Sequence, residues 1–176
     1  MMGTVPTPCT LLSEEELALQ QSVREFSLNV VKPKVLEMDE TMTMCPDLIK
    51  GCFDNGLMGI ETSTELNGSG FSFFGSILAI EELAKVDPAV SVMVDVQNTL
   101  VNNIFFNYGN ETVKKKFLPQ LAQKSLGSFC LTEAGSGSDA FALKTKAERK
   151  GDKWVINGSK AWITNAGEAE IFAVFA

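Results

Sequence analysis

The hydrophobic periodicity of this 176-residue chain changes once, near residue 125, and that change limits the possible folds more than any other feature. Up to about residue 123 the apolar side chains recur at helical spacing. From residue 125 the apolar runs are short, rich in strand-forming residues and separated by turn residues. The sequence therefore predicts an α+β chain with a disordered or extended terminus over 1–12, an all-helical domain over 13–124, and the first part of an antiparallel β domain over 125–176.

Capping and helix-breaking residues indicate where the helices begin and end. Ser13 and Glu16 have the spacing of a capping box, which predicts a helix start. Pro33 is expected to bend or stop this first helix, because proline lacks the N–H donor that a helix needs. Glu81 and Glu82 are expected on the solvated face of a later helix. Further helices are predicted at 46–55, 75–86, 88–107 and 113–123.

Four short apolar runs after residue 125 are predicted as strands. Asn157-Gly158 lies between two of them and predicts a type I′ hairpin turn, because both central residues of that turn need positive φ. Trp154, on one strand of that hairpin, is expected in the sheet core. Residues 171–176 are all apolar and predict a further buried strand, which is typical of the front part of a longer chain. The four predicted strands are 126–132, 141–147, 154–156 and 161–163.

Composition excludes several kinds of chemistry. The chain has no histidine, which removes Ser-His-Asp catalysis, Cys-His catalysis and every histidine-bearing zinc site. A formal net charge of −7 disfavours a nucleic-acid partner, and the basic run 114–116 is expected on a solvated helix face. No stretch reaches the roughly 20 apolar residues of a membrane span, and no metal site is predicted. The cysteines form no C-x-x-C pair and are predicted to be reduced thiols: Cys9, Cys45, Cys52 and Cys130.

A Gly/Ser turn at 135–138 is the first candidate binding element. Its backbone can direct successive N–H groups toward an anion without any lysine or arginine. The alternative is a flexible loop between two strands. The turn is not followed by the lysine of a P-loop or by the helix of a dinucleotide fingerprint. Asp139, directly after it, is expected to lock the turn and not to act as an acid.

Trp162 and Thr164 form the second candidate element. On a strand, residues i and i+2 project from the same face about 6 to 7 Å apart. An indole could then cover a flat ring while the hydroxyl binds the ring edge. The alternative is a tryptophan packed inside the sheet. Together the two elements would suit a flat ring with polar edges joined to a diphosphate.

Several motifs, in order along the chain, resemble those of the acyl-CoA dehydrogenase family. They are Phe-Cys-Leu-Thr-Glu-Ala-Gly-Ser-Gly-Ser-Asp at 129–139, Asn-Gly-Ser-Lys at 157–160 and Trp-Ile-Thr at 162–164. The stretches Gly-Leu-Met-Gly-Ile at 56–60 and Ile-Glu-Glu-Leu-Ala-Lys-Val-Asp at 80–87 agree with them. The resemblance covers nearly all of residues 13–176 and is strongest to the short/branched-chain (2-methylbutyryl-CoA) type.

The resemblance implies part of a tetrameric FAD enzyme of the mitochondrial matrix. Such enzymes take acyl-CoA as substrate, remove hydrogen from its α and β carbons, and pass electrons to electron-transferring flavoprotein. Their glutamate base lies in a C-terminal domain beyond Ala176, so no catalytic residue is expected in this chain. The resemblance implies that Thr164 binds flavin N5, that Trp162 covers one ring face, and that Ser138 also meets the CoA arm of the substrate. The full set of cofactor-binding residues that it implies is Phe129, Cys130, Leu131, Thr132, Glu133, Ala134, Gly135, Ser136, Gly137, Ser138, Trp162, Ile163 and Thr164.

Two alternatives stay open. The chain could be of the isovaleryl, short-chain or glutaryl type, because in this family the residues that select the acyl group lie mostly in the part beyond Ala176. It could also be a catalytically inactive, truncated product that acts as a binding or assembly module. The fragment alone is expected to bind flavin weakly, because a tight site encloses most of its ligand.

Overall fold

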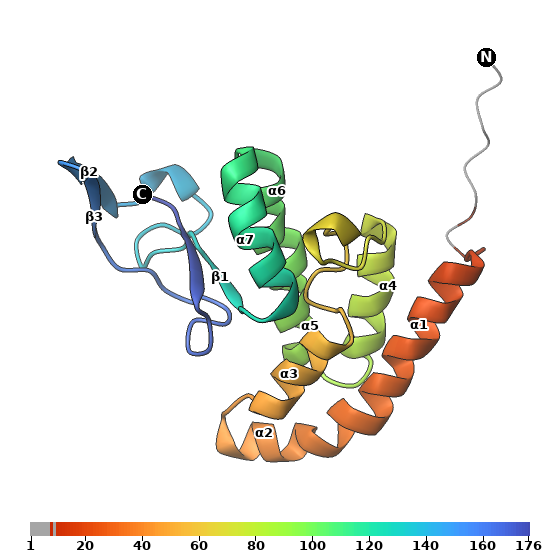
Figure 1. The fold of residues 1–176 in the computed structure, drawn as a ribbon. Coiled ribbons are helices and arrows are strands. Elements are labelled where there is room, and N and C mark those ends of the chain that lie inside the picture. Colours follow the sequence, from red (N-terminus) through yellow and green to blue (C-terminus); the bar gives the residue numbers. More distant parts are fainter. Residues whose placement is uncertain (1–7, 9) are drawn as a thin grey trace.

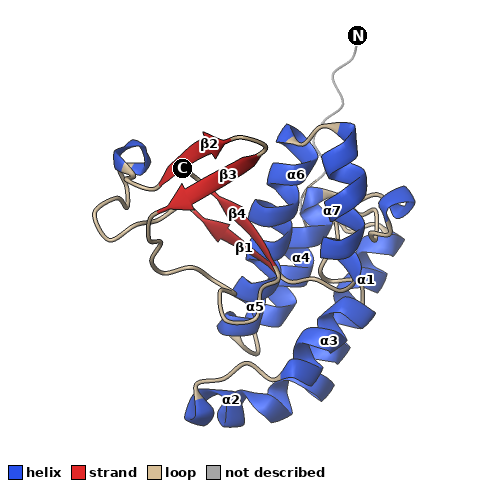
Figure 2. Ribbon diagram, turned by 60° about the vertical axis from the view of Figure 1, so that its left-hand side comes forward, coloured by secondary structure: helices blue, strands red, loops and turns tan. Residues whose placement is uncertain are grey.

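The structure is a computed structural model that describes residue 8 and residues 10–176. Most of the predicted terminal segment 1–12, including Cys9, lies outside the described residues. Helices form one body and all the strands lie to one side of it, beside α5, α6 and α7 (Figures 1 and 2). This order of helices followed by strands confirms the predicted α+β class.

The helices begin and end close to the predicted signals. At the capping box, the Ser13 hydroxyl accepts a hydrogen bond from the Glu16 N–H, and the Glu16 carboxylate accepts one from the Ser13 N–H. Gly56 follows the third helix with a φ of 69°, which glycine adopts without steric cost. The bounds are α1 Glu14–Phe26, α2 Val35–Thr41, α3 Pro46–Asp54, α4 Phe73–Ala84, α5 Pro88–Asp95, α6 Asn103–Tyr108 and α7 Glu111–Gln123.

Of the two outcomes predicted at Pro33, a bend or a stop, the stop does not occur. A π-helical segment, Ser27–Val31, and a 3₁₀ turn, Lys32–Lys34, carry the chain from α1 directly into α2. Such changes in hydrogen-bond spacing are a common way for a helix to accommodate a missing donor. A second π-helical segment, Val96–Asn102, joins α5 to α6, so that 88–108 forms one continuous run close to the predicted 88–107.

Glu82 is not on a solvated helix face, which corrects the expectation for the Glu81–Glu82 pair. Its side chain is 2% exposed, whereas that of Glu81 is 56% exposed. The Arg24 guanidinium, on α1, donates two hydrogen bonds to the Glu82 carboxylate at 3.0 and 2.8 Å, and the Lys85 ammonium donates a third at 2.8 Å. These donors compensate the buried charge of Glu82, and the two bonds from Arg24 hold α1 against α4.

The apolar core divides into a larger part within the helices and a smaller part under the sheet. The larger part packs side chains from every helix up to α5 and includes Leu126, the residue before the first strand. In the smaller part, Phe129 and Ile171 of the strands pack against the second π-helical segment and α7. This contact fixes the start of the sheet on the helical body. The smaller core consists of Val96, Val101, Leu121, Phe105, Phe117, Phe129 and Ile171.

The strands form two separate pairs. One pair is antiparallel, as predicted, and joins β2 to β3. The other joins β1 to β4 in parallel, with Gly127 opposite Ile171 and Cys130 opposite Val174, which corrects the expectation of antiparallel pairing throughout. The bounds are β1 Gly127–Cys130, β2 Lys146–Lys150, β3 Lys153–Asn157 and β4 Ile171–Val174.

Three details of the predicted strands are wrong. Asn157-Gly158 is not the hairpin turn, because β2 and β3 are joined through Gly151, whose φ is 66°. Residues 161–163 form no strand, and 140–142 form a 3₁₀ turn. Residues 171–176 alternate between half-buried and exposed, so this segment has only one face against the protein.

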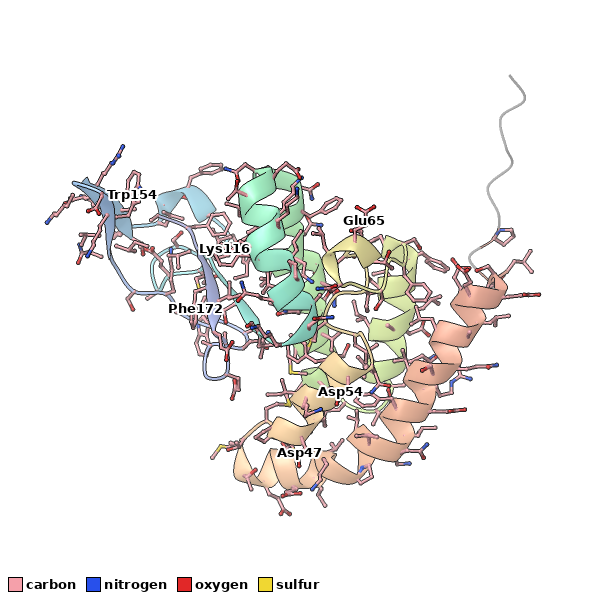
Figure 3. The ribbon with its side chains drawn as sticks, viewed as in Figure 1. Asp47, Asp54, Glu65, Lys116, Trp154 and Phe172 are labelled. Atoms are coloured by element: carbon pink, nitrogen blue, oxygen red, sulfur yellow. The ribbon has the colours of Figure 1, made fainter. Side chains whose placement is uncertain are left out.

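Trp154 lies on the solvent side of the β2–β3 hairpin and not in a core. Its side chain is 65% exposed, and it projects from the hairpin at the end of the molecule farthest from α1 (Figure 3). The hairpin is exposed along nearly all of both strands, which explains why no core forms around this indole. Cys130 is buried as predicted, and Cys45, Cys52 and Cys130 are free thiols. No helix in the described residues is long and apolar enough to cross a bilayer.

Candidate functional site

The end of β1 and the segment 160–164 lie side by side, although some thirty residues separate them in the sequence. The Ala161 N–H donates a hydrogen bond of 2.9 Å to the Thr132 carbonyl. The Ser128 hydroxyl donates one of 2.9 Å to the Thr164 carbonyl. These two bonds bring together the two segments in which the candidate binding residues were found.

Trp162 adopts a backbone conformation that a bulky residue seldom takes. Its φ is 59°, in the left-handed region, and its side chain is 93% exposed. The expected geometry of two side chains on one strand face is therefore wrong for Trp162 and Thr164, because residue 162 is part of a turn. A left-handed L-residue costs about 1–2 kcal/mol, and such strain persists only where neighbouring contacts hold it. The backbone strain at Trp162 therefore accompanies a large aromatic face that is exposed to solvent.

Asn165 fixes the other end of this turn. It also has a positive φ, of 66°, which asparagine tolerates better than most residues. Its side-chain amide donates to the Gly127 carbonyl of β1 at 3.1 Å and, more weakly, to the Met93 carbonyl of α5 at 3.4 Å. The turn that carries Trp162 is therefore tied both to the sheet and to the helical body.

Glu133 is the centre of a buried polar cluster next to the turn. Its carboxylate accepts hydrogen bonds from the Lys160 ammonium at 2.8 Å, from the Lys144 N–H at 2.6 Å, and from both the N–H and the hydroxyl of Thr145. Lys160 also donates to the Leu131 carbonyl at 3.0 Å. The bonds from Lys160, Thr145 and the Lys144 N–H lower the pKa of Glu133 to about 2, because all of them favour the charged form. Glu133 is therefore ionised at any pH at which the protein works.

The Gly/Ser turn forms a narrow loop beyond Glu133. Glu133 and Ser136 exchange backbone hydrogen bonds across it, and the buried Ser136 hydroxyl donates to the Asp139 carbonyl. Gly135 has open space where a Cβ would stand, and Ser138 is exposed. The loop borders a cleft of about 300 Å³ lined by Glu133, Ala134, Gly135, Lys144, Thr145, Gly158 and Ser159.

Thr164 lines a second, more apolar cleft of about 460 Å³ between α5 and the segment 164–168. Met93 and Val92 of α5 form one wall, and Leu126 and Asn165 contribute to the other. In the described part of the chain, the hydroxyls of Thr132 and Thr164 make no hydrogen bond to another protein group, although both residues are half-buried. Thr164 is two residues after Trp162, and the Thr132 carbonyl is bonded to the residue before Trp162. Hydroxyls without a protein partner in these two segments suit a ligand with polar edges.

The candidate residues divide by what their side chains do. The Phe129 ring packs on Phe175 at 4.9 Å between centroids, and Cys130 is 5% exposed, so both side chains belong to the sheet core. The Cys130 thiol is therefore covered by the protein, whereas Phe129 is half-buried. Ala134, Gly135, Gly137 and Ser138 are exposed, and Leu131, Thr132, Ile163 and Thr164 are half-buried at the edge of the sheet.

Three residues that organise the site were not singled out from the sequence: Ser128, Lys160 and Asn165. Lys160 and Asn165 flank the Trp-Ile-Thr motif, but nothing local indicates what they contact. Their partners lie 27 or more residues away. The feature that identifies Lys160 is its buried contact with Glu133, and this contact exists only in the folded chain.

Two family profiles match consecutive parts of the chain. The profile described as "Acyl-CoA dehydrogenase, N-terminal domain" matches residues 13–125, and "Acyl-CoA dehydrogenase, middle domain" matches residues 128–176. Together they account for nearly all of the described residues.

Named relatives agree with these profiles. The chain is 55% identical over 170 residues to a Dictyostelium discoideum protein named as a probable short/branched chain specific acyl-CoA dehydrogenase, covering 96% of this chain and 41% of the relative. It is 47% identical to the mitochondrial short/branched chain specific acyl-CoA dehydrogenase of Rattus norvegicus, covering 96% and 39%. A Mycobacterium smegmatis glutaryl-CoA dehydrogenase, solved in complex with FADH2, superposes with a TM-score of 0.89 at 32% identity, covering 96% and 44%. The chain thus spans about two fifths of the length of the relatives that it matches.

Proposed function

The chain belongs to the acyl-CoA dehydrogenase family, and from this premise we propose that it forms the helical front and part of the FAD-binding wall of a short/branched-chain acyl-CoA dehydrogenase. The proposed reaction of the full-length protein is the α,β-dehydrogenation of a branched short-chain acyl-CoA thioester. The names and the identities of the two curated relatives support this specificity over the isovaleryl and glutaryl types.

One observation carries the proposal: an exposed indole held at positive φ in a turn that is hydrogen-bonded to the end of β1. A tryptophan in such a position gains nothing from the protein's own core. Backbone strain of this kind is concentrated at functional sites, where neighbouring contacts maintain it. The relative solved with FADH2 has the same fold over this region, which supports a flavin as the ligand.

In the proposal each residue has a limited role. FAD supplies the acceptor for two electrons when it is bound. Trp162 would cover one face of the ring and exclude water, while the hydroxyls of Thr132 and Thr164 would orient the ring edge. The exposed Gly/Ser loop faces the diphosphate with N–H groups, and Ser138 is the candidate contact for the CoA arm of the substrate. No residue of this chain is proposed as the catalytic base.

Substitutions at Trp162 and Thr164 in the full-length protein test this proposal. The parental protein should carry flavin absorbance that bleaches when 2-methylbutyryl-CoA is added without oxygen. Trp162→Ala should weaken FAD binding roughly tenfold, since stacking on an aromatic side chain is worth about 1–3 kcal/mol. Thr164→Val, which keeps the shape and removes the hydroxyl, should slow flavin reduction.

Trp154→Ala is the matched control, because Trp154 is an exposed indole on the distant hairpin. It should leave FAD binding and reduction at parental values. A parental protein without flavin would refute the proposal. Equal FAD binding by the Trp162→Ala and Trp154→Ala proteins would refute the role of Trp162, and parental reduction by Thr164→Val would refute that of Thr164.

Partners and location follow from the same proposal. We propose that electrons leave to electron-transferring flavoprotein, that the full-length protein is a homotetramer, and that it works in the mitochondrial matrix. The mitochondrial name of the rat relative supports the location. The first two points rest on the family resemblance alone.

A further inference from the structure

The Glu133–Lys160 pair stands out because it is buried, charged and unnecessary for the chemistry described above. The two side chains are 8% and 10% exposed, and their charged atoms are 2.8 Å apart. A buried pair of this kind is seldom kept for stability alone, because removing both charges from water costs about as much as their attraction returns. Its position next to the proposed flavin wall suggests another role.

Groups of the protein itself already bind both oxygens of the Glu133 carboxylate. It accepts four hydrogen bonds, which is about the number that a carboxylate can accept. Glu133 is also one of the predicted cofactor-binding residues. Through the bonds to its side chain it can in addition act on the cofactor by way of the segments that it holds.

Lys160 connects these segments to one another. Its ammonium donates to the Leu131 carbonyl at the end of β1 and to Glu133, which in turn binds the backbone of residues 144–145. The next residue along the chain, Ala161, donates to the Thr132 carbonyl. Lys160 is thus two residues before the strained Trp162 and fixes the strand against which that turn is built.

We propose that Glu133 and Lys160 are a pair of positioning residues that hold the 160–164 turn against the end of β1 and keep the net charge beside the flavin ring at zero. The inference rests on the proposed flavin site. A fixed positive charge favours added electrons, and a fixed negative charge disfavours them. Each half of the pair, left alone, should therefore move the flavin potential in the opposite direction.

The test measures the flavin midpoint potential of the full-length parental holoprotein and of four variants. Glu133→Gln leaves an unpaired ammonium and should raise the potential. Lys160→Gln leaves an unpaired carboxylate, still held by residues 144–145, and should lower it. The double variant restores neutrality and should return close to the parental value, whereas Lys160→Arg should keep both charges and stay near it.

A second readout needs no flavin. In the flavin-free proteins, hydrogen exchange at the Ala161 amide should accelerate roughly tenfold in Lys160→Gln, because loss of a hydrogen bond to a charged group loosens the turn. Lys160→Arg should remain protected. This measurement separates the positioning role of the pair from the proposed flavin site, because the exchange rate can be measured even in a protein that does not bind flavin.

Several results would overturn the inference. Shifts of the same sign in Glu133→Gln and Lys160→Gln would mean that the pair acts by general loosening and not by charge. Unchanged potentials would remove the electrostatic role, and unchanged Ala161 exchange would remove the positioning role. If either glutamine variant does not fold, the Lys160→Arg protein provides the test. Fast hydrogen exchange at its Ala161 amide would contradict the proposal.

Discussion

Replacing Gln97 by leucine should destabilise the junction between the helices and the sheet. Gln97 is completely buried in the π-helical segment between α5 and α6. Its side-chain amide donates to the Leu121 carbonyl at 2.7 Å and to the Ser125 carbonyl at 3.2 Å, and its carbonyl accepts from the Gly127 N–H at 2.8 Å. One side chain thus joins the second π-helical segment, the end of α7 and the start of β1.

The magnitude follows from the partners that the substitution leaves unpaired. Leucine keeps most of the volume but removes three hydrogen bonds in a site closed to water. At about 1 kcal/mol for each bond, the loss is about 3 kcal/mol. For a protein of this size that corresponds to a fall in melting temperature of about 6–12 °C, at about 2–4 °C for each kcal/mol. Thermal unfolding of the flavin-free protein, followed by circular dichroism, measures it.

Two further variants make the Gln97 experiment specific. Gln97→Glu keeps the size but places a carboxylate oxygen against two carbonyls, so it should destabilise at least as much as Gln97→Leu. Gln123→Leu, at an exposed position in the last turn of α7, is the control and should change stability by less than about 0.5 kcal/mol. The reasoning fails if Gln97→Leu melts within about 2 °C of the parental protein, a shift of less than about 1 kcal/mol.

Two other predictions concern acid stability and close packing. The pKa of Glu133 falls from 4.5 to about 2 on folding, so its contribution to stability is full above about pH 4.5 and is lost as the pH falls toward 2. Denaturant unfolding between pH 2 and 6 should show a flatter profile for Glu133→Gln, and parallel profiles would contradict the assignment. At Gly59 a Cβ would stand 2.6 Å from the Ala122 Cβ, so Gly59→Ala should destabilise by about 1–3 kcal/mol. Gly135→Ala meets nothing within 4 Å and should stay within about 0.5 kcal/mol, and equal melting of the two alanine variants would refute the packing argument.

The helices were predictable because their signals are local. Ser13 and Glu16 are three residues apart, and Gly56 directly follows the helix that it ends. Such short-range signals do not depend on where the rest of the chain lies. Glu82 shows the limit of this reasoning, because its burial depends on Arg24, which is 58 residues earlier in the chain. Local charge patterns predicted a solvated face, and the tertiary partner reversed that prediction.

Strand pairing was predicted less well, because it depends on contacts between distant residues. The partner of β1 is β4, more than forty residues away, and their parallel alignment has no local turn to signal it. Asn157-Gly158 has the residues of a hairpin turn but lies at the end of β3 and does not join two strands. A Cβ on Gly158 would stand 2.3 Å from the Thr145 hydroxyl, so glycine is needed there for close packing next to Glu133. The true hairpin turn is at Gly151.

Three departures from local rules lie close together in this structure, and their combination at one place supports the proposed function. A bulky residue at positive φ, an indole that is 93% exposed and a buried carboxylate–ammonium pair would each count against a stable fold if taken alone. All three lie within the strip formed by the end of β1 and the segment 160–164, where hydrogen bonds from Ser128, Lys160 and Ala161 hold them. A chain that needed only to fold would place a small polar residue at position 162. Because the surrounding bonds maintain the strain and leave the indole uncovered, the strip supports the proposal that a ligand binds against that face.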